Sequence, residues 1–191
     1  MIYESILTSV SSDGIPHIAP FGVREHQGLI FIAPFRPSTT LDNLLATRQA
    51  VLNFTDDVRV FAGSLTGHRD WPLRPATQVN GQVLISALTH QELELVEVRD
   101  DEVRPELYFR IVHEEMHTPF RGFNRAQAAV IELAVLVSRL HMLPIEKIDA
   151  ELEYLSIAID KTAGEKELQA WQWLIDKVEN HKAMMAGSNL A

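Results

Sequence analysis

The segment PFRPSTTLDNLL (residues 34–45) joins an apolar strand to a helix that we expect from Thr39 to Arg48. Two prolines make the turn rigid, and it carries Arg36. This order places a guanidinium, hydroxyl groups and the unpaired N–H groups of a helix start around one point, as in phosphate-binding sites. A second interpretation needs no ligand, because Thr39 with Asp42 three residues later matches a capping box. The segment alone leaves both interpretations open.

The composition is that of a globular protein. With 191 residues, 46% apolar and 23% charged, the chain is long enough for one domain or a domain with an appended subdomain. It has no cysteine, so disulfides, thiolate nucleophiles and cysteine-bound metals are excluded. It has no membrane-span-length apolar run and no signal-peptide pattern at its start. We therefore expect a cytoplasmic protein that does not insert into a membrane.

The charge is acidic, with a formal net value of -9. Proteins that bind nucleic acid carry a basic face, whereas the arginines here occur singly. We expect no nucleic-acid partner, and any bound anion should be small and held by a few residues.

The first half of the chain has the pattern of short strands. Asp13-Gly14 is a turn dipeptide between two strand-like stretches, which predicts a hairpin. The expected strands cover residues 6–10, 16–23, 29–33, 50–55, 58–65, 91–99 and 107–113. Residues 67–77, which include Trp71, are expected to form a loop folded over another part of the protein.

The pattern becomes helical after Asn124, a good N-cap. We expect one helix from there to a break at Pro144 and two more over residues 146–159 and 165–184. Short antiparallel strands followed by helices predict an α+β protein, a small barrel with a helical C-terminal part.

A zinc-protease motif, H-E-x-x-H, occurs at His113–His117. The motif works on a helix, where both imidazoles reach one zinc ion. The preceding residues have a β-rich composition, and in a strand residues four apart are roughly 13 Å from each other. We interpret the segment as a strand end with charged flanks and expect no metal site, and zinc hydrolysis remains a weaker alternative.

Two other polar segments each have a structural interpretation beside a functional one. Asp56 and Asp57 are adjacent and point to opposite faces if extended, which argues against a paired-carboxylate mechanism. The segment 120–126 carries two arginines and two phenylalanines. It could contact an anion or join the strands to the helices, and the residues favour neither interpretation.

Three segments together resemble the FMN-binding split-barrel superfamily, which includes flavin reductases and pyridoxamine-phosphate-oxidase-like proteins. They are SSDGIPHIAPFGV (residues 11–23), FRPSTTLDNL (35–44) and VLNFTDD (51–57). Residues 122–132 are similar to the helical C-terminal part of an uncharacterised family within it. The resemblance covers nearly the whole chain.

The resemblance implies a fold, a cofactor and a site. The fold is a six-stranded antiparallel FMN-binding split β-barrel over residues 1–118, with a helical C-terminal subdomain over residues 119–191. FMN would be held noncovalently near the interface of a homodimer. The residues expected at the phosphate are Arg36, Ser38, Thr39 and Thr40, with Asn43 holding the turn or touching the ligand. Those expected at the flavin ring are His17, Ala19, Pro20, Phe21, Asn53 and Thr55.

The function implied is flavin chemistry, since flavin carries the redox step and the protein supplies binding and orientation. We expect an FMN-dependent oxidoreductase whose substrate and electron donor are unknown. A flavin-binding carrier, sensor or assembly protein without turnover is the alternative. No side chain stands out as a catalytic acid or base.

Overall fold

The computed structural model of the protein describes residues 1–188 and contains two compact units. The first comprises residues 1–56 and 70–120, and the second comprises residues 57–69 and, within the described chain, residues 121–188. The chain thus leaves the first unit for a short excursion before it returns to complete it.

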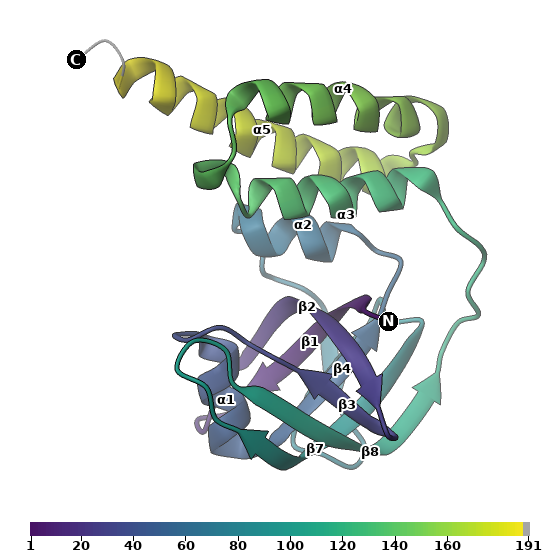
Figure 1. Cartoon of the computed structure of the whole chain (residues 1–191). Helices are drawn as coiled ribbons and strands as arrows, with labels where there is room; N and C mark the ends of the chain where they lie inside the picture. Colours follow the sequence, from purple (N-terminus) through teal and green to yellow (C-terminus); the bar gives the residue numbers. More distant parts are fainter. Residues whose placement is uncertain (189–191) are drawn as a thin grey trace. The chain divides into compact units, whose positions relative to one another are not determined.

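A closed barrel of six antiparallel strands forms the first unit (Figure 1). Its strands are β1 (Tyr3–Val10), β2 (Pro16–His26), β3 (Leu29–Ile32), β4 (Gln49–Phe54), β7 (Thr89–Arg99) and β8 (Glu106–Met116). They are hydrogen-bonded in the order β1-β2-β3-β8-β7-β4, and β4 pairs with β1 to close the ring. The predicted α+β barrel with C-terminal helices is therefore confirmed.

Tight turns set the register of the first strands. Gly14 adopts a left-handed φ of 83° between β1 and β2, as expected for the Asp-Gly turn. Gln27 and Gly28 have φ values of 52° and 76°, which allow β2 to turn directly into β3. The core inside the barrel is aliphatic, with one fully buried aromatic ring at Phe109.

A small hairpin lies within the segment between β4 and β7. It consists of β5 (Leu73–Pro75) and β6 (Gln82–Leu84), which pair with each other in a separate two-stranded sheet. The expectation of an irregular loop over residues 67–77 was wrong in its last part, because residues 73–75 gain a strand partner from further along the chain.

The second unit is helical. Its elements are α2 (Arg59–Thr66), α3 (Arg125–Val137), the 3-10 turn η1 (Leu140–Met142), α4 (Ile145–Thr162) and α5 (Glu165–Ser188). The expected strand over residues 58–65 was wrong. Val58 and Ala62 are four residues apart and both are buried in the core with α3, α4 and α5, so the tertiary contacts favour a helix.

The predicted start of α3 is confirmed. Asn124 has an extended backbone, and its Oδ1 accepts hydrogen bonds from the N–H groups of Ala126 at 2.8 Å and Gln127 at 3.3 Å. Among residues 1–188, no helix is both long enough and apolar enough to cross a membrane.

Candidate functional site

Helix α1 (Thr39–Thr47) follows β3 in the barrel unit and begins with a side-chain cap. Ser38 has extended backbone angles, φ -157° and ψ 140°, and its Oγ accepts a hydrogen bond from Leu41 N at 3.2 Å. The expectation that Thr39 caps the helix through a box with Asp42 was therefore wrong. An N-cap needs a non-helical backbone, whereas Thr39 already belongs to the first helical turn.

Arg36 lies just before this helix start, and its guanidinium is held by an acidic turn. Its Nη2 contacts Asp100 Oδ1 at 2.6 Å, and its Nε donates to the carbonyl of Asp101 at 3.1 Å. The side chains are 40% exposed for Arg36 and 82% exposed for Asp100. A pair this exposed is weakly held, so the guanidinium can exchange one anionic partner for another.

The acidic turn itself is ordered. Hydrogen bonds from the N–H groups of Arg104 and Val103 lower the pKa of Asp101, and the charge of Arg36 lowers it further. The turn between β7 and β8 therefore keeps its negative charge next to Arg36.

The other polar residues of α1 divide between surface and interior. Thr39 is exposed, whereas Thr40 is only 3% exposed. Asn43 is also buried, and its amide donates a hydrogen bond to Ser9 Oγ on β1 at 3.1 Å. Asn43 thus fastens α1 to the barrel, and this contact uses one of its amide hydrogens.

The predicted flavin-ring residues of β2 lie along one open edge. His17, Ala19, Pro20 and Phe21 are half-buried and face Ser9, Leu7, Ile6 and Ser5 of β1 in the register. On its other side β2 pairs with β3 only from Arg24 to His26. Within the described part of the chain, no strand of the barrel pairs with residues 18–23 on that edge.

The expected site residues of β4 are engaged within the barrel. Asn53 is fully buried; its amide donates to Ile6 O and Thr8 Oγ1, and its Oδ1 accepts from Leu84 N at 2.9 Å. Thr55 donates its hydroxyl to Ser86 O at 2.8 Å. These contacts connect β4 to β1 and to the β5–β6 segment.

The helix start and β2 are connected through β1. Asn43 binds Ser9, and Ser9 is the register partner of His17, so the first turns of α1 lie beside this end of β2. Arg36, Ser38 and Thr39 form the accessible polar group at the start of the helix. The role of every one of these residues toward a ligand stays a prediction.

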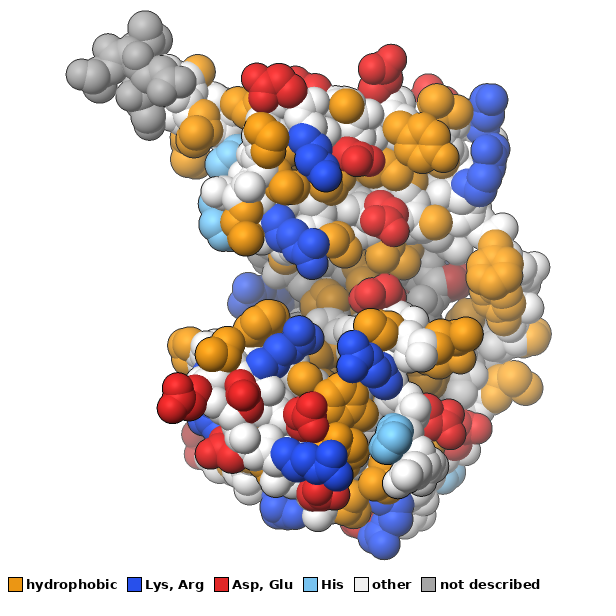
Figure 2. Space-filling view, in the orientation of Figure 1, with side chains coloured by type: hydrophobic (Ala, Val, Ile, Leu, Met, Phe, Trp, Pro, Cys, Tyr) orange, Lys and Arg blue, Asp and Glu red, His pale blue; other side chains and the backbone are white. Residues whose placement is uncertain are grey.

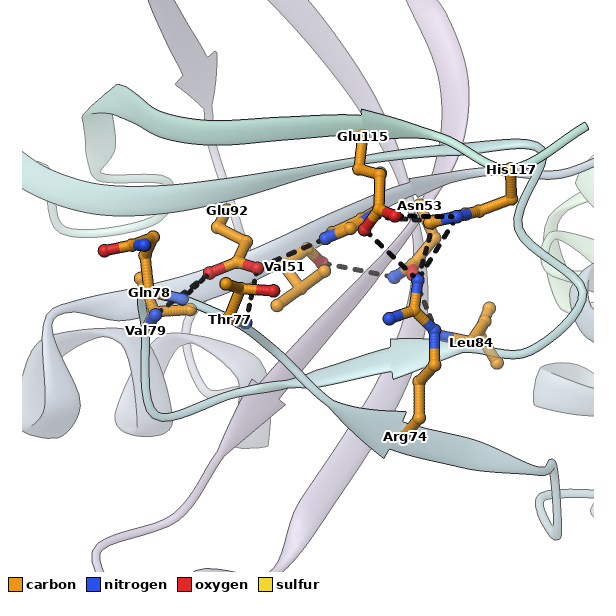
Figure 3. A network of polar contacts seen from close by, with 11 residues as sticks. Val51, Asn53, Arg74, Thr77, Gln78, Val79, Leu84, Glu92, Glu115 and His117 are labelled. Atoms are coloured by element: carbon orange, nitrogen blue, oxygen red, sulfur yellow. Dashed lines mark hydrogen bonds and ion pairs between the residues drawn. The ribbon is translucent and has the colours of Figure 1, made fainter.

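Sequence reasoning missed a cluster of histidines and glutamates on β7 and β8 (Figure 3). Glu92 is fully buried and accepts three backbone hydrogen bonds, from the N–H groups of Thr77 at 2.6 Å, Gln78 at 2.5 Å and Val79 at 2.9 Å. Burial alone would raise the pKa of Glu92, but these hydrogen bonds outweigh it and lower the pKa. Glu92 therefore anchors the loop between β5 and β6 to the barrel.

The H-E-x-x-H segment is extended, as expected. His113 and Glu115 belong to strand β8, and His117 follows its end. The helical geometry that a zinc-protease motif needs is absent from these residues. His113, Glu115 and His117 are two residues apart in sequence, and in a strand this spacing places side chains on one face. This alternation was the sequence signal that could have predicted their grouping.

Charges of both signs alternate over the barrel face shown in Figure 2, and blue and red side chains lie next to each other. No basic stripe runs across this face, in line with the acidic net charge of -9.

The barrel architecture is the one found in solved FMN-binding proteins and flavin reductases. The FMN-bound protein MM1853 from Methanosarcina mazei has 19% identity, covers 92% of this chain and 94% of its own, and has a TM-score of 0.78. The 2-nitrobenzoate 2-nitroreductase NbaA from Pseudomonas fluorescens has 22% identity over 60% of this chain and 64% of its own, with a TM-score of 0.52. BorF, the flavin reductase component of a bacterial two-component tryptophan halogenase, has 16% identity over 62% and 82%, with a TM-score of 0.53.

The chain belongs to the DUF447 family. Residues 3–118 match the model described as the N-terminal domain of a protein of unknown function (DUF447), and residues 124–176 match the model of the C-terminal DUF447 region. None of the curated proteins matches the chain.

Proposed function

We propose that the barrel binds FMN noncovalently and that the protein is a flavin-dependent oxidoreductase whose substrate is unidentified. The observation that carries this proposal is the accessible start of α1, where Ser38 caps the helix and Arg36 lies two residues before it. The FMN-bound relative from Methanosarcina mazei, similar over 92% of this chain, supports the choice of cofactor.

The residues at the helix start fit a phosphate group. Arg36 supplies a guanidinium, Ser38 and Thr39 supply hydroxyls, and the first turn of α1 supplies N–H groups without helical partners. Thr40 and Asn43 are buried, and we assign them to positioning the turn.

The open edge of β2 fits the flavin ring. Its backbone groups from His17 to Phe21 can bond to the polar edge of the ring, while Ala19, Pro20 and Phe21 provide apolar surface. Asn53 and Thr55 would act from β4 by holding the strands in place. Bound FMN would supply hydride or electron transfer, and these residues would bind and orient it.

We further propose a homodimer. The unpaired edge of β2 is the kind of strand edge that a native protein covers, and a second copy of the barrel could cover it together with the flavin. The electron donor would be a reduced nicotinamide, in keeping with the NADH:FAD oxidoreductase SgcE6 from Streptomyces globisporus, which has a similar barrel.

The first experiment is a visible absorption spectrum of the purified protein, with mass analysis of anything released on denaturation. Flavin bands and released FMN are the expected result. Reduction by NADH or NADPH followed by reoxidation would support an enzyme, whereas bound FMN that no donor reduces would favour a carrier or sensor. A colourless protein that takes up no added FMN would overturn the proposal.

The second experiment tests the phosphate contact. Arg36→Ala should remove a charge-assisted hydrogen bond worth roughly 1.5–3 kcal/mol and weaken FMN binding by about ten- to a hundred-fold. Arg110→Ala is the matched control, because Arg110 is also an exposed arginine paired with a carboxylate, Glu94 at 2.7 Å. Equal FMN affinity of the two variants would place the phosphate elsewhere.

A further inference from the structure

A group of metal-ligand side chains gathers on one face of β7 and β8. His90 is the register partner of Glu115, and Glu92 is the partner of His113, so the two neighbouring strands present these four side chains together. The nitrogens of His90 and His113 and a carboxylate oxygen of Glu115 all lie within 4.8 Å of one another. Two imidazoles and a carboxylate are a ligand set that holds Zn²⁺ with a further position left for water.

The second nitrogen of His90 is already fixed by a carboxylate. His90 Nε2 lies 3.2 Å from Glu92 Oε1, and both side chains are fully buried. Glu92 is in turn held by three backbone N–H groups, as described above. Metal-binding histidines in proteins are oriented by such a carboxylate on the far side of the ring. The nitrogen of His90 that would remain for a metal ion is Nδ1, which contacts His117 Nε2 at 2.9 Å in this structure.

His113 takes no part in the hydrogen bonds that hold Glu92, His90 and the loop of residues 77–79 together. Glu92 accepts backbone hydrogen bonds from residues 77–79 and contacts His90, and none of these contacts involves His113. The ring of His113 lies 5.7 Å from that of His90, centroid to centroid, and has no hydrogen-bond partner among residues 1–188. An imidazole directed at this group without a bond of its own is available as a ligand.

His117 adds a nearby nitrogen, and Arg74 adds a competing charge. His117 Nε2 is 2.9 Å from His90 Nδ1, and Figure 3 shows Arg74 of β5 reaching both His117 and Glu115. The Nη2 of Arg74 is 2.8 Å from His117 Nε2 and 3.7 Å from Glu115 Oε2. A metal ion would compete with this guanidinium for the same groups, and Arg74, at 36% side-chain exposure, can turn toward solvent.

We propose that His90, His113 and Glu115 bind one divalent transition-metal ion of the Zn²⁺ class, with His117 beside them and Glu92 orienting His90. The ligand atoms lie within 4.8 Å of one another, and they would have to lie well inside that limit around Zn²⁺, because each bond is about 2.0–2.1 Å long. Glu115 can make the closing movement, since its side chain is 47% exposed. This proposal differs from the expectation of no metal site and is independent of the flavin proposal.

The test is a calorimetric titration of the full-length, EDTA-treated protein with Zn²⁺. One ion should bind per chain. His113→Ala should weaken binding at least a hundred-fold, and Glu92→Gln should weaken it about ten- to a hundred-fold through the orientation of His90. Arg74→Met should tighten binding several-fold, because it removes the competing guanidinium.

His26→Ala is the matched control, since His26 is an exposed histidine of the same barrel at the end of β2. It should bind Zn²⁺ as the wild type does. His113 is only partly buried, so its variant is expected to fold; Glu115→Gln, at an exposed position, provides a second test. Absence of saturable binding in both the wild type and Arg74→Met, or full binding in His113→Ala, would overturn the site.

Discussion

Asn43 of α1 donates its side-chain amide to Ser9 Oγ of β1 across 3.1 Å, and both residues are buried. This hydrogen bond fixes the helix that carries the proposed phosphate turn to the strand that pairs with His17. A buried hydrogen bond to a barrel strand thus helps to set the position of the turn at the start of α1.

We expect Asn43→Ala to lower the free energy of unfolding by about 1–3 kcal/mol, because Ser9 loses its buried partner. FMN affinity should fall only a few-fold, since the contact positions the turn without touching the ligand. Chemical denaturation and flavin titration measure the two effects. Ser9→Ala serves as the partner variant and should behave similarly; a loss of affinity as large as that of Arg36→Ala would instead make Asn43 a ligand contact.

Asp100 and the FMN phosphate are expected to compete for Arg36. Asp100→Asn should therefore tighten FMN binding, by up to about five-fold, because exposed ion pairs are worth about 0–1 kcal/mol. Titrations at several salt concentrations provide the measurement. Asp42→Asn, which removes an exposed acid from the first turn of α1, separates a general charge effect from this pair. A gain of equal size in both variants would contradict direct competition.

Asp57 should make the stability of the helical unit depend on pH. Burial opposes its charge, but the hydrogen bonds of Arg59 and the charge of Lys166 outweigh burial and lower the pKa of Asp57. Arg59 binds both carboxylate oxygens, at 2.8 and 2.6 Å, and Lys166 lies 3.3 Å away. Because the folded pKa is lowered, this stabilisation is complete above the ordinary pKa of about 3.9 and is lost as the pH falls through the folded value.

Asp57→Asn should cost about 1–3 kcal/mol of unfolding free energy at neutral pH, and the difference from wild type should shrink in acid. Urea unfolding at a series of pH values provides the curve. Asp160→Asn, at an exposed position of α4, is the control and should change little. A difference that stays constant from neutral to acid pH would show that the charge of Asp57 is not the cause.

Two glycines with the same crowding should respond differently to alanine. A Cβ on Gly81 would lie 2.9 Å from Val51 Cγ2, and Val51 is fully buried. A Cβ on Gly22 would lie 2.9 Å from Ile2 Cγ2, but Ile2 is 52% exposed and can move away. We expect Gly81→Ala to destabilise the protein by about 1–3 kcal/mol and Gly22→Ala by less. Thermal unfolding compares them, and equal losses would refute the argument.

The barrel was readable from the sequence because its strands and turns carry local signals. Asp13-Gly14 marks a hairpin, and Asn124 marks the start of α3, and both act over a few residues. The prediction of a strand over residues 58–65 was wrong because Val58 and Val60 suit a strand as well as a helix. The contacts of Val58 and Ala62 with the later helices decided between them.

The site was only partly readable for a related reason. Arg36 and the helix start are neighbours in sequence, so their proximity could be expected. The histidine–glutamate cluster depends on the pairing of β7 with β8 and on hairpin β5–β6, three segments whose alignment no local pattern specifies. Ser38 was not predicted as the N-cap, because Ser38, Thr39 and Thr40 all carry a hydroxyl group that can cap a helix.

Because residues 57–69 belong to the helical unit, the two units cannot be separated by a single cut in the chain. A fragment that ends near residue 118 would keep α2 but lose α3 and α5, leaving Val58 and Ala62 without the apolar surface that covers them. A fragment that begins near residue 118 would lack α2, which contributes part of the hydrophobic core of the helical unit. In the order of the chain, α2 precedes the helices that cover Val58 and Ala62, so this core is complete only when α5 is present.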